Sequence, residues 1–175
     1  VSHLHLPVQS GSNEILAQMK RNYSREDYLE IVSKLSKVRP GIKISSDFIV
    51  GFPNETDLDF QQTMELINEV KFDASFSFIY SSRPGTPASQ LQDVTTLAEK
   101  KERLYILQKR LDELHVDYSN ELTGSIQRCL VTGVSKKNIN QLQARTECNR
   151  VVNFDFQNIN ILGKLVDINI TKAYQ

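Results

Sequence analysis

The chain has 175 residues, of which 39% are hydrophobic and 24% are charged, and its formal net charge is zero. This size suits one ordinary domain or one and a half small ones, and the composition is that of a globular protein. No run is long and apolar enough to cross a membrane and no signal peptide is visible, so we expect a cytoplasmic protein without a membrane partner.

The first 119 residues alternate strand-like apolar runs with helical patterns. Residues 3–8 predict a strand, and a short helix is expected over residues 13–21. Ser24, with Asp27 three residues later, predicts the start of a second helix that ends before Pro40. The apolar face of this helix carries Tyr28, Ile31, Val32, Leu35 and Val38.

Two further strand and helix pairs follow. The β-branched and aromatic stretch 42–50 predicts a strand, and residues 56–70 predict an amphipathic helix. Residues 74–80 predict a third strand, after which Thr96 and Glu99 resemble a capping box that opens a long helix. The apolar faces of the two helices are Phe60, Met64, Ile67 and Val70, then Leu104, Leu107, Leu111, Leu114 and Tyr118.

This β-α-β-α-β-α order predicts an α/β fold over residues 1–119. Alternation of this kind indicates parallel strands with crossover helices, in an open sheet or part of a barrel. Three such units are half of a common barrel, and residue 1 is Val rather than Met, so we expect the chain to be a piece of a longer protein.

The pattern changes after Leu122. Short runs rich in β-branched residues are separated by Gly124, Gly133 and Gly163, and no helical periodicity remains. We therefore predict a small antiparallel barrel or sheet, with one domain over residues 1–119 and a second over residues 120–175.

Charge differs between these two parts. Residues 1–119 carry 14 Lys and Arg against 17 Asp and Glu, a net charge of −3, whereas residues 120–175 carry 7 against 4, a net charge of +3. A basic excess indicates an anionic partner for the second part. Its candidate phosphate-binding side chains are Lys136, Lys137, Arg145 and Arg150. For any one of them a solvated surface charge is the alternative, but as a group they favour nucleic acid.

Candidate binding residues in the first part gather where strands end. In parallel α/β folds ligands bind at the carboxyl ends of the strands, and here those ends lead into "VQSGS", "VGFPNET" and "YSSRPGTP". Alternation along residues 42–50 predicts that Phe48 and Asp47 lie on opposite faces of this strand. Asp47 is notable because a carboxylate in a central strand is costly unless it is paired or ligand-bound. Gln9 and Ser10 would lie near it on the preceding strand, and Arg21 could hold a carboxylate at the same place. The alternatives are a structural hydrogen bond for Asp47 and a favourable helix C-terminal charge for Arg21.

Metal ligands are not evident in the sequence. His3 and His5 share one strand face without a third ligand nearby, so we interpret them as polar residues of the interior or rim. Cys129 and Cys148 have no Cys or His at metal-ligand spacing, so reduced thiols are expected and no metal site is predicted within the chain.

Four strings carry a resemblance to a known family: "HLPVQSGS", "ISSDFIVGFPNET", "FDASFSFIYSSRPGTPAS" and "RTECNRVVNF". In this order they resemble the radical-SAM methylthiotransferases, and most of all the branch that modifies prenylated adenosine in tRNA. The resemblance covers essentially the whole chain. One departure is Asn54, where the family usually has Gly after "GFP".

The resemblance implies a fold for each part. Residues 1–119 would be the C-terminal half of a radical-SAM partial (β/α)6 barrel, and residues 120–175 a small all-β, OB-like TRAM domain that lacks its last strand. Members of the family also carry two [4Fe–4S] clusters, one in an N-terminal domain and one in the first half of the barrel. The ligands of both clusters would therefore lie outside this chain.

The resemblance also assigns cofactor and partners. S-adenosylmethionine would be bound by Gln9 with Ser10 beside it, by Arg21 through its methionine carboxylate, by Asp47 through its ribose, and by Ile49 through backbone contacts to adenine. The implied reaction is radical methylthiolation of C2 of N6-dimethylallyladenosine at position 37, next to the anticodon. The implied partners are the tRNA anticodon stem-loop and a flavodoxin-type electron donor, and the enzyme is expected to be a monomer.

Three alternatives remain open at this stage. The substrate could be threonylcarbamoyladenosine or ribosomal protein S12, which related family members modify. The chain could also be a non-catalytic RNA-binding module whose α/β part is only scaffold. Gln9, Arg21 and Asp47 favour the enzyme, since a scaffold would not need them.

Overall fold

The computed structural model describes residues 1–155 and 159–174, so Gln175 of the predicted second domain lies outside it. The chain divides into two compact units, Leu4–His115 and Val1–His3 with Val116–Gln175. We call them the α/β unit and the β unit.

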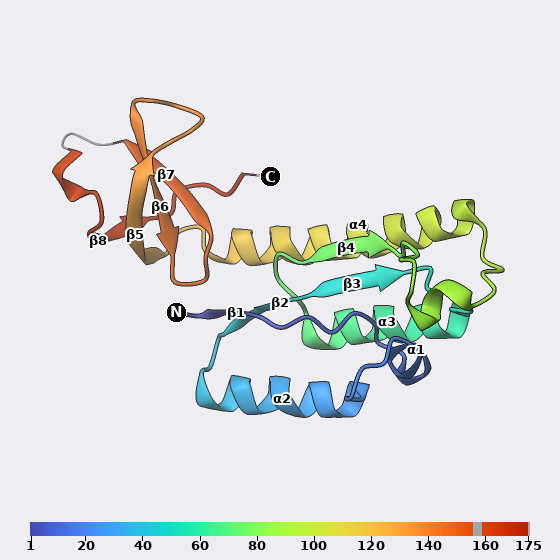
Figure 1. The fold of residues 1–175 in the computed structure, drawn as a ribbon. Helices are drawn as coiled ribbons and strands as arrows, with labels where there is room; N and C mark the ends of the chain where they lie inside the picture. Colours follow the sequence, from blue (N-terminus) through green and yellow to red (C-terminus); the bar gives the residue numbers. More distant parts are fainter. Residues whose placement is uncertain (156–158, 175) are drawn as a thin grey trace. The chain divides into compact units, whose positions relative to one another are not determined.

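The α/β unit alternates strands and helices in the predicted order (Figure 1). Its elements are β1 (His3–His5), α1 (Asn13–Gln18), α2 (Arg25–Val38), β2 (Lys43–Ser45), β3 (Asp47–Val50), α3 (Asp57–Val70), β4 (Phe76–Ile79), the short 3-10 helix Pro87–Gln90, and α4 (Leu97–Glu121), whose last turns belong to the other unit.

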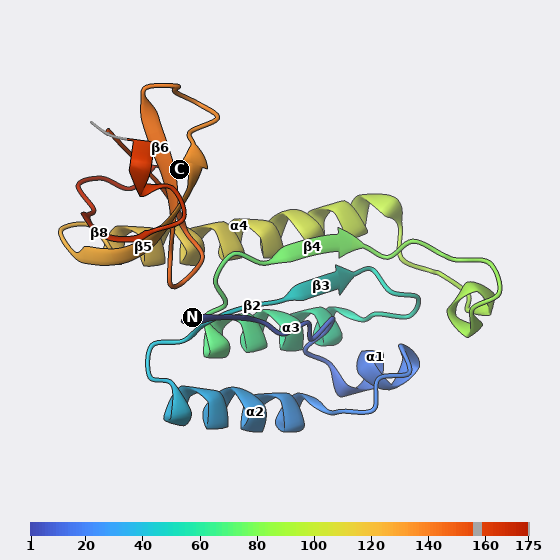
Figure 2. The same cartoon turned by 60° about the vertical axis from the view of Figure 1, so that its left-hand side comes forward.

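The strands of the α/β unit confirm the parallel arrangement. β3 pairs in parallel with β4, and an isolated parallel bridge joins Gln9 to Phe48. β1 pairs with β2. Figure 2 shows β3 and β4 side by side and pointing the same way.

Three helix starts are closed by capping boxes. Ser24 with Asp27 and Thr96 with Glu99 confirm the predicted caps. Thr56 with Asp59 forms a third, which the sequence analysis did not single out. Each hydroxyl accepts a backbone N–H that the helix leaves unpaired, and each carboxylate accepts the N–H of the capping residue.

Two predicted elements are shorter than expected. The first strand ends at His5 rather than residue 8, and the first helix ends at Gln18 rather than residue 21, because Lys20 adopts a left-handed φ of 58° that a helix cannot continue.

The predicted strand over residues 42–50 is divided into β2 and β3 at Ser46. The backbone N–H of Ser46 donates to Ser75 Oγ, and its own hydroxyl accepts the Val8 N–H at 2.9 Å. At Ser46, hydrogen bonds to side chains thus replace the backbone hydrogen bonds of a continuous strand. The local sequence pattern does not predict this interruption.

One face of β3 forms the core of the α/β unit. Phe48 and Val50 are fully buried, and Phe48 meets Phe72 edge to face with ring centroids 5.1 Å apart. On α3 only Ile67 of the predicted face is fully buried, because the buried stripe also uses Thr63 and Leu66. The buried core comprises Val8, Tyr28, Ile44, Phe48, Val50, Leu66, Ile67, Phe72, Leu107, Leu111 and Leu114.

The β unit confirms the predicted antiparallel sheet. Its strands are β5 (Ile126–Val134), β6 (Gln141–Thr146), β7 (Val151–Asp155) and β8 (Leu165–Asn169), in the order β7-β6-β5-β8. All three strand pairs are antiparallel. A small core lies on one face, where Cys129, Val131, Leu142 and Ala144 are buried.

Gly11 marks a close backbone contact between the loop after β1 and α3. A Cβ at this position would lie 2.5 Å from Gln62 O and 2.6 Å from Thr63 Cα, both backbone atoms that cannot move independently. We expect Gly11→Ala to lower the free energy of unfolding by about 1–3 kcal/mol, the usual cost of overpacking. Denaturation followed by circular dichroism at 222 nm measures this. Gly133→Ala is the control, since a Cβ there meets nothing within 4 Å, and equal stability of the two variants would contradict the prediction.

Candidate functional site

The face of β3 and β4 opposite the core is open and carries polar and aromatic side chains. Asp47 and Ile49 lie on this face and pair in register with Phe76 and Phe78 of β4. The Asp47 side chain keeps 30% of its surface exposed. The predicted alternation along β3 is therefore confirmed, with a carboxylate on the face that the helices do not cover.

Gln9 lies next to Asp47 and Ile49 through the backbone. Its N–H donates to Asp47 O at 2.9 Å, and its carbonyl accepts the Ile49 N–H at 2.9 Å. Gln9 has a φ of 74°, a left-handed conformation that is uncommon outside glycine. The structure thus brings together three of the five residues predicted to hold S-adenosylmethionine.

His5 is an additional member of this group that sequence reasoning missed. Its Nε2 lies 3.5 Å from Asp47 Oδ2, and its Nδ1 lies 3.0 Å from Ser45 Oγ. The sequence indicates His5 only as a polar residue of the interior or rim. The contact depends on which strands pair, and no local pattern in the sequence encodes that pairing.

Ser10 differs from its predicted role as a cofactor contact. It is fully buried, with its Oγ 3.3 Å from Thr63 Oγ1 and accepting the Ser12 N–H at 3.2 Å. The Gly11 N–H also donates to Thr63 Oγ1, at 2.9 Å. These bonds attach the loop to α3, so we reassign the Ser10 side chain to positioning the loop.

Asp59 joins this loop to the start of α3. Its Oδ1 accepts the Ser12 hydroxyl at 2.6 Å, and its Oδ2 accepts the Thr56 hydroxyl at 2.6 Å. Burial alone would raise the pKa of the Asp59 carboxyl, but the hydrogen bonds from Ser12 and Thr56 hold the pKa below its ordinary value.

Arg21 is exposed, and its side chain makes no hydrogen bond or ion pair with the residues that the structure describes. It lies close enough to Tyr23 to lower the pKa of that phenol in part, against the larger raising effect of burial. The Tyr23 hydroxyl donates to Val8 O at 3.2 Å, directly before Gln9. Arg21 therefore lies near the Gln9 loop with its guanidinium available.

The loop after β3 is held by a buried ion pair. Glu55 Oε2 accepts the Gly51 N–H at 2.8 Å and lies 2.8 Å from Arg103 Nη1, and the Glu55 side chain is only 1% exposed. Burial raises the pKa of Glu55, although the Gly51 N–H and Arg103 both favour its charged form. Asn54 adopts a φ of 67°, so this residue supports the turn where the family usually has Gly.

Lys100 of α4 covers the same loop. Its side chain is buried and ion-paired with Asp93, and its Cγ lies 2.5 Å from where a Cβ of Gly51 would stand. Gly51 has a φ of 68°, so both its conformation and the covering lysine require glycine. The loop after β3 is thus fixed from two positions on α4.

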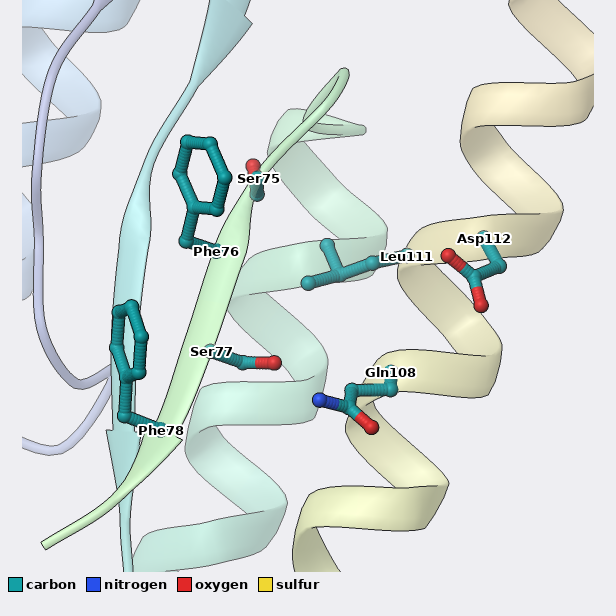
Figure 3. Close-up of a pocket in the computed structure, with 7 residues that line it drawn as sticks. All are labelled: Ser75, Phe76, Ser77, Phe78, Gln108, Leu111 and Asp112. Carbon is teal, nitrogen blue, oxygen red and sulfur yellow. The ribbon is translucent and has the colours of Figure 1, made fainter.

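A shallow depression of about 310 Å³ lies on the other side of β4, between this strand and α4 (Figure 3). Ser77, Gln108 and Asp112 point into the space between strand and helix, whereas Phe76 and Phe78 point away from α4. Residues of β4 line the depression, and Asp47 and Ile49 do not.

The four basic candidates of the β unit do not form one cluster. Lys136 and Lys137 are exposed in the turn between β5 and β6, whereas Arg145 and Arg150 lie near the opposite end of β6. Arg145 Nη1 donates to Asn149 O and Oδ1, both at 3.0 Å, and Arg150 Nε donates to Ser119 Oγ at 3.2 Å. The two arginines thus bind neighbouring groups of the β unit. Of the four candidates, Lys136 and Lys137 make no such side-chain hydrogen bond with the residues that the structure describes.

The chain offers no site for an iron–sulfur cluster among the residues described. No group of three or more His, Cys, Asp or Glu side chains could hold a metal in residues 1–155 and 159–174. Cys129 is buried in the β unit, where burial raises the pKa of its thiol, and Cys148 lies 3.2 Å from Thr146 Oγ1. In the same described ranges, no helix has the length and apolar character to span a membrane.

The Glu55–Arg103 pair generates a pH-dependent prediction. Arg103→Ala leaves a buried carboxylate without its cation, so we expect the free energy of unfolding to fall by about 3–5 kcal/mol at pH 7. In the variant the pKa of Glu55 should rise further. A carboxyl whose pKa is raised by folding contributes stability at pH values below its pKa in the unfolded protein, and this contribution is lost as the pH rises through its pKa in the folded protein. The deficit relative to the parent should therefore shrink toward pH 4, as urea denaturation at several pH values would measure.

The matched control for this variant is Asp57→Ala. Asp57 is the other carboxylate bound to Arg103, but its side chain is fully exposed. We expect no measurable change from this substitution. A deficit for Arg103→Ala that stayed constant with pH would show that Glu55 is not the group left without a partner.

Comparison with known proteins accounts for both units. The model of the radical SAM superfamily matches residues 1–67, and that of the TRAM domain matches residues 121–175. Several tRNA-2-methylthio-N(6)-dimethylallyladenosine synthases are similar over 99% of the chain: those of Alcanivorax borkumensis, Hahella chejuensis and Histophilus somni are 56%, 57% and 58% identical. The chain spans 39%, 39% and 36% of these relatives. Residues 1–67 are therefore similar to the radical SAM superfamily, and residues 121–175 are similar to the TRAM domain.

Proposed function

We propose that this chain is part of a radical-SAM tRNA methylthiotransferase that modifies C2 of N6-dimethylallyladenosine at position 37. The observation that carries the proposal is that Asp47 and Ile49 lie on the open face of β3, where the backbone of Gln9 is hydrogen-bonded to both of them. These three residues lie within the segment matched by the radical SAM model. The relatives named for this reaction are 53–58% identical along nearly the whole chain.

The α/β unit would contribute one half of a partial (β/α)6 barrel, and the β unit an OB-like TRAM domain. The parallel pairing of β3 with β4 and the bridge at Gln9 support the first assignment. The antiparallel order β7-β6-β5-β8 supports the second. We place the domain boundary between residues 119 and 120, close to the start of the TRAM match at residue 121.

The residues of the open face fit S-adenosylmethionine. Asp47 offers a partly exposed carboxylate that can accept both ribose hydroxyls, and the backbone of Gln9 is hydrogen-bonded beside it. Ile49 would contact adenine, and Arg21 would bind the methionine carboxylate. When bound, S-adenosylmethionine supplies the radical chemistry, so the task of these residues is to bind and orient it.

The residues of this chain do not fit an iron–sulfur cluster, which needs cysteine thiolates at close spacing. Cys129 and Cys148 lie in the β unit, whereas the Asp47 face belongs to the α/β unit, and no set of three ligands exists among the described residues. We propose that the two [4Fe–4S] clusters are bound by segments outside this chain. Their reduction would come from a flavodoxin-type donor, and the enzyme would act as a monomer on the anticodon stem-loop.

Two other substrates and a non-catalytic role are the competing hypotheses. Threonylcarbamoyladenosine or ribosomal protein S12 would require the same cofactor face, so Asp47 does not discriminate among them. The names of the relatives favour the dimethylallyl substrate. Mass spectrometry of tRNA nucleosides from a strain without the gene tests this directly. We expect N6-dimethylallyladenosine to accumulate without its methylthio group, and unchanged nucleosides would refute the function.

Cofactor binding gives the next prediction. In the full-length protein, Asp47→Ala or Arg21→Ala should weaken S-adenosylmethionine binding by about 1.5–3 kcal/mol, the value of a hydrogen bond to a charged group. Isothermal calorimetry measures the affinity, and a thermal melt shows that each variant is folded. Asp112→Ala is the control, because this carboxylate lies on the α4 side of β4. Unchanged affinity for both variants would remove Asp47 and Arg21 from the cofactor site.

RNA binding gives a second prediction. Replacing Lys136 and Lys137 with Ala should weaken tRNA binding about equally for all substrate sequences, because phosphate contacts carry no sequence information. The slope of log affinity against log salt should fall by about 0.7–0.9 for each phosphate that is no longer neutralised, since fewer counterions are released. Titration of tRNA at several salt concentrations measures both effects. Lys34→Ala, an exposed lysine of α2 paired with Glu30, is the control, and a parental slope in the double variant would place the pair outside the RNA footprint.

A further inference from the structure

Two large aromatic side chains of β4 stand on the open face of the sheet. Phe76 is 62% exposed and Phe78 is 55% exposed, although phenylalanine is usually buried. Figure 3 shows both rings on the side of β4 away from α4, with Ser77 pointing toward the helix. The alternation of the strand thus directs two apolar rings away from the core, where they gain nothing from the packing of the helices.

The two rings are continuous with the proposed cofactor residues. Phe76 pairs in register with Asp47, and Phe78 pairs with Ile49. Neighbouring strands lie about 4.8 Å apart, so each ring stands directly beside one of these residues. An apolar strip of Ile49, Phe76 and Phe78 therefore borders a single carboxylate, which His5 already accompanies.

We propose that Phe76 and Phe78 form the surface that receives the apolar N6 substituent of the substrate adenosine and so determine its specificity. This inference rests on the proposed function, because the relatives are named for a dimethylallyl substrate. The dimethylallyl group is a branched hydrocarbon that gains affinity by leaving water against apolar rings.

The same arrangement disfavours a charged N6 substituent. A threonylcarbamoyl group carries a carboxylate, which would lie beside the carboxylate of Asp47 and against rings that offer it no hydrogen bond. Placing like charges together and desolvating one of them are both unfavourable. The strip would thus accept the dimethylallyl group and discriminate against the threonylcarbamoyl group.

The test compares three anticodon stem-loops that differ only at position 37, with adenosine, N6-dimethylallyladenosine or N6-threonylcarbamoyladenosine. Their affinities for the full-length protein are measured by fluorescence anisotropy, which requires no turnover. We expect the parent to prefer the dimethylallyl RNA. Phe76→Ala and Phe78→Ala should each lower this preference by about tenfold, the effect of removing apolar surface from a pocket. Binding of the unmodified RNA should stay as in the parent.

Two matched variants sharpen the test. Ser77→Ala lies between the rings on the other side of β4 and should keep the full preference. Phe76→Leu keeps an apolar side chain, so this variant should keep most of the preference for the dimethylallyl RNA, even if Phe76→Ala folds poorly. The thermal stability of each variant without RNA shows whether the rings contribute to the stability of the protein itself. A marked loss of stability in both alanine variants would mean that another protein segment covers the rings, and this would overturn the inference.

The outcomes also separate the inference from the function beneath it. If the parent methylthiolates dimethylallyl tRNA but the Phe→Ala variants keep their preference for the dimethylallyl RNA, the inference is wrong and the function stands. If the unmodified and the dimethylallyl RNA lose affinity equally in these variants, the rings contact RNA without selecting the substituent. This result also overturns the inference. If the parent neither prefers nor modifies the dimethylallyl RNA, the proposed function itself fails.

Discussion

The carboxylate of Asp59 is the interaction on which the candidate site depends. Its two oxygens each accept a hydroxyl at 2.6 Å, one from Ser12 at the start of α1 and one from Thr56 at the start of α3. One buried group thus fixes the ends of two loops that follow two different strands. Hydrogen bonds to a carboxylate are stronger than those between neutral groups, and here they also hold its pKa low, so the link persists over the neutral pH range.

The helices pack on the face of β3 that carries Phe48 and Val50, and they leave the Asp47 face open. Gly11 lies against the backbone of α3, Glu55 is paired with Arg103 of α4, and Lys100 covers Gly51. These contacts are all buried, so the two loops cannot swing without exposing unpaired charges. The position of Asp47 on the open face, and that of the Gln9 backbone beside it, are therefore set by groups that a ligand would never touch.

Local patterns could predict the elements but not their long-range partners. The alternation over residues 42–50 predicted correctly that Phe48 is buried and that Asp47 is not, because a strand's faces follow from a period of two. The contact of His5 with Asp47 depends on pairing between strands about forty residues apart, and no local signal encodes that register. Ser10 was predicted to contact a ligand from its place at the end of a strand. Its observed partner, Thr63, lies on a helix more than fifty residues away, where no local pattern points to it. The four basic residues were grouped by sequence proximity, but the length of β6 separates the two lysines before the strand from the two arginines near its end.

Under the proposed function, the two units would serve recognition by different physical means. Lys136 and Lys137 stand in an exposed turn, where a flexible ammonium can meet a phosphate but cannot distinguish one base from another. Selection of a particular adenosine must then come from a surface that contacts the base and its substituent. The open face of the α/β unit offers such a surface, since a hydrogen-bonding carboxylate and two exposed rings stand on adjacent strands in fixed register. In this proposal, affinity from charge and specificity from shape and apolar contact would come from separate units, and a substitution in one should leave the contribution of the other unchanged.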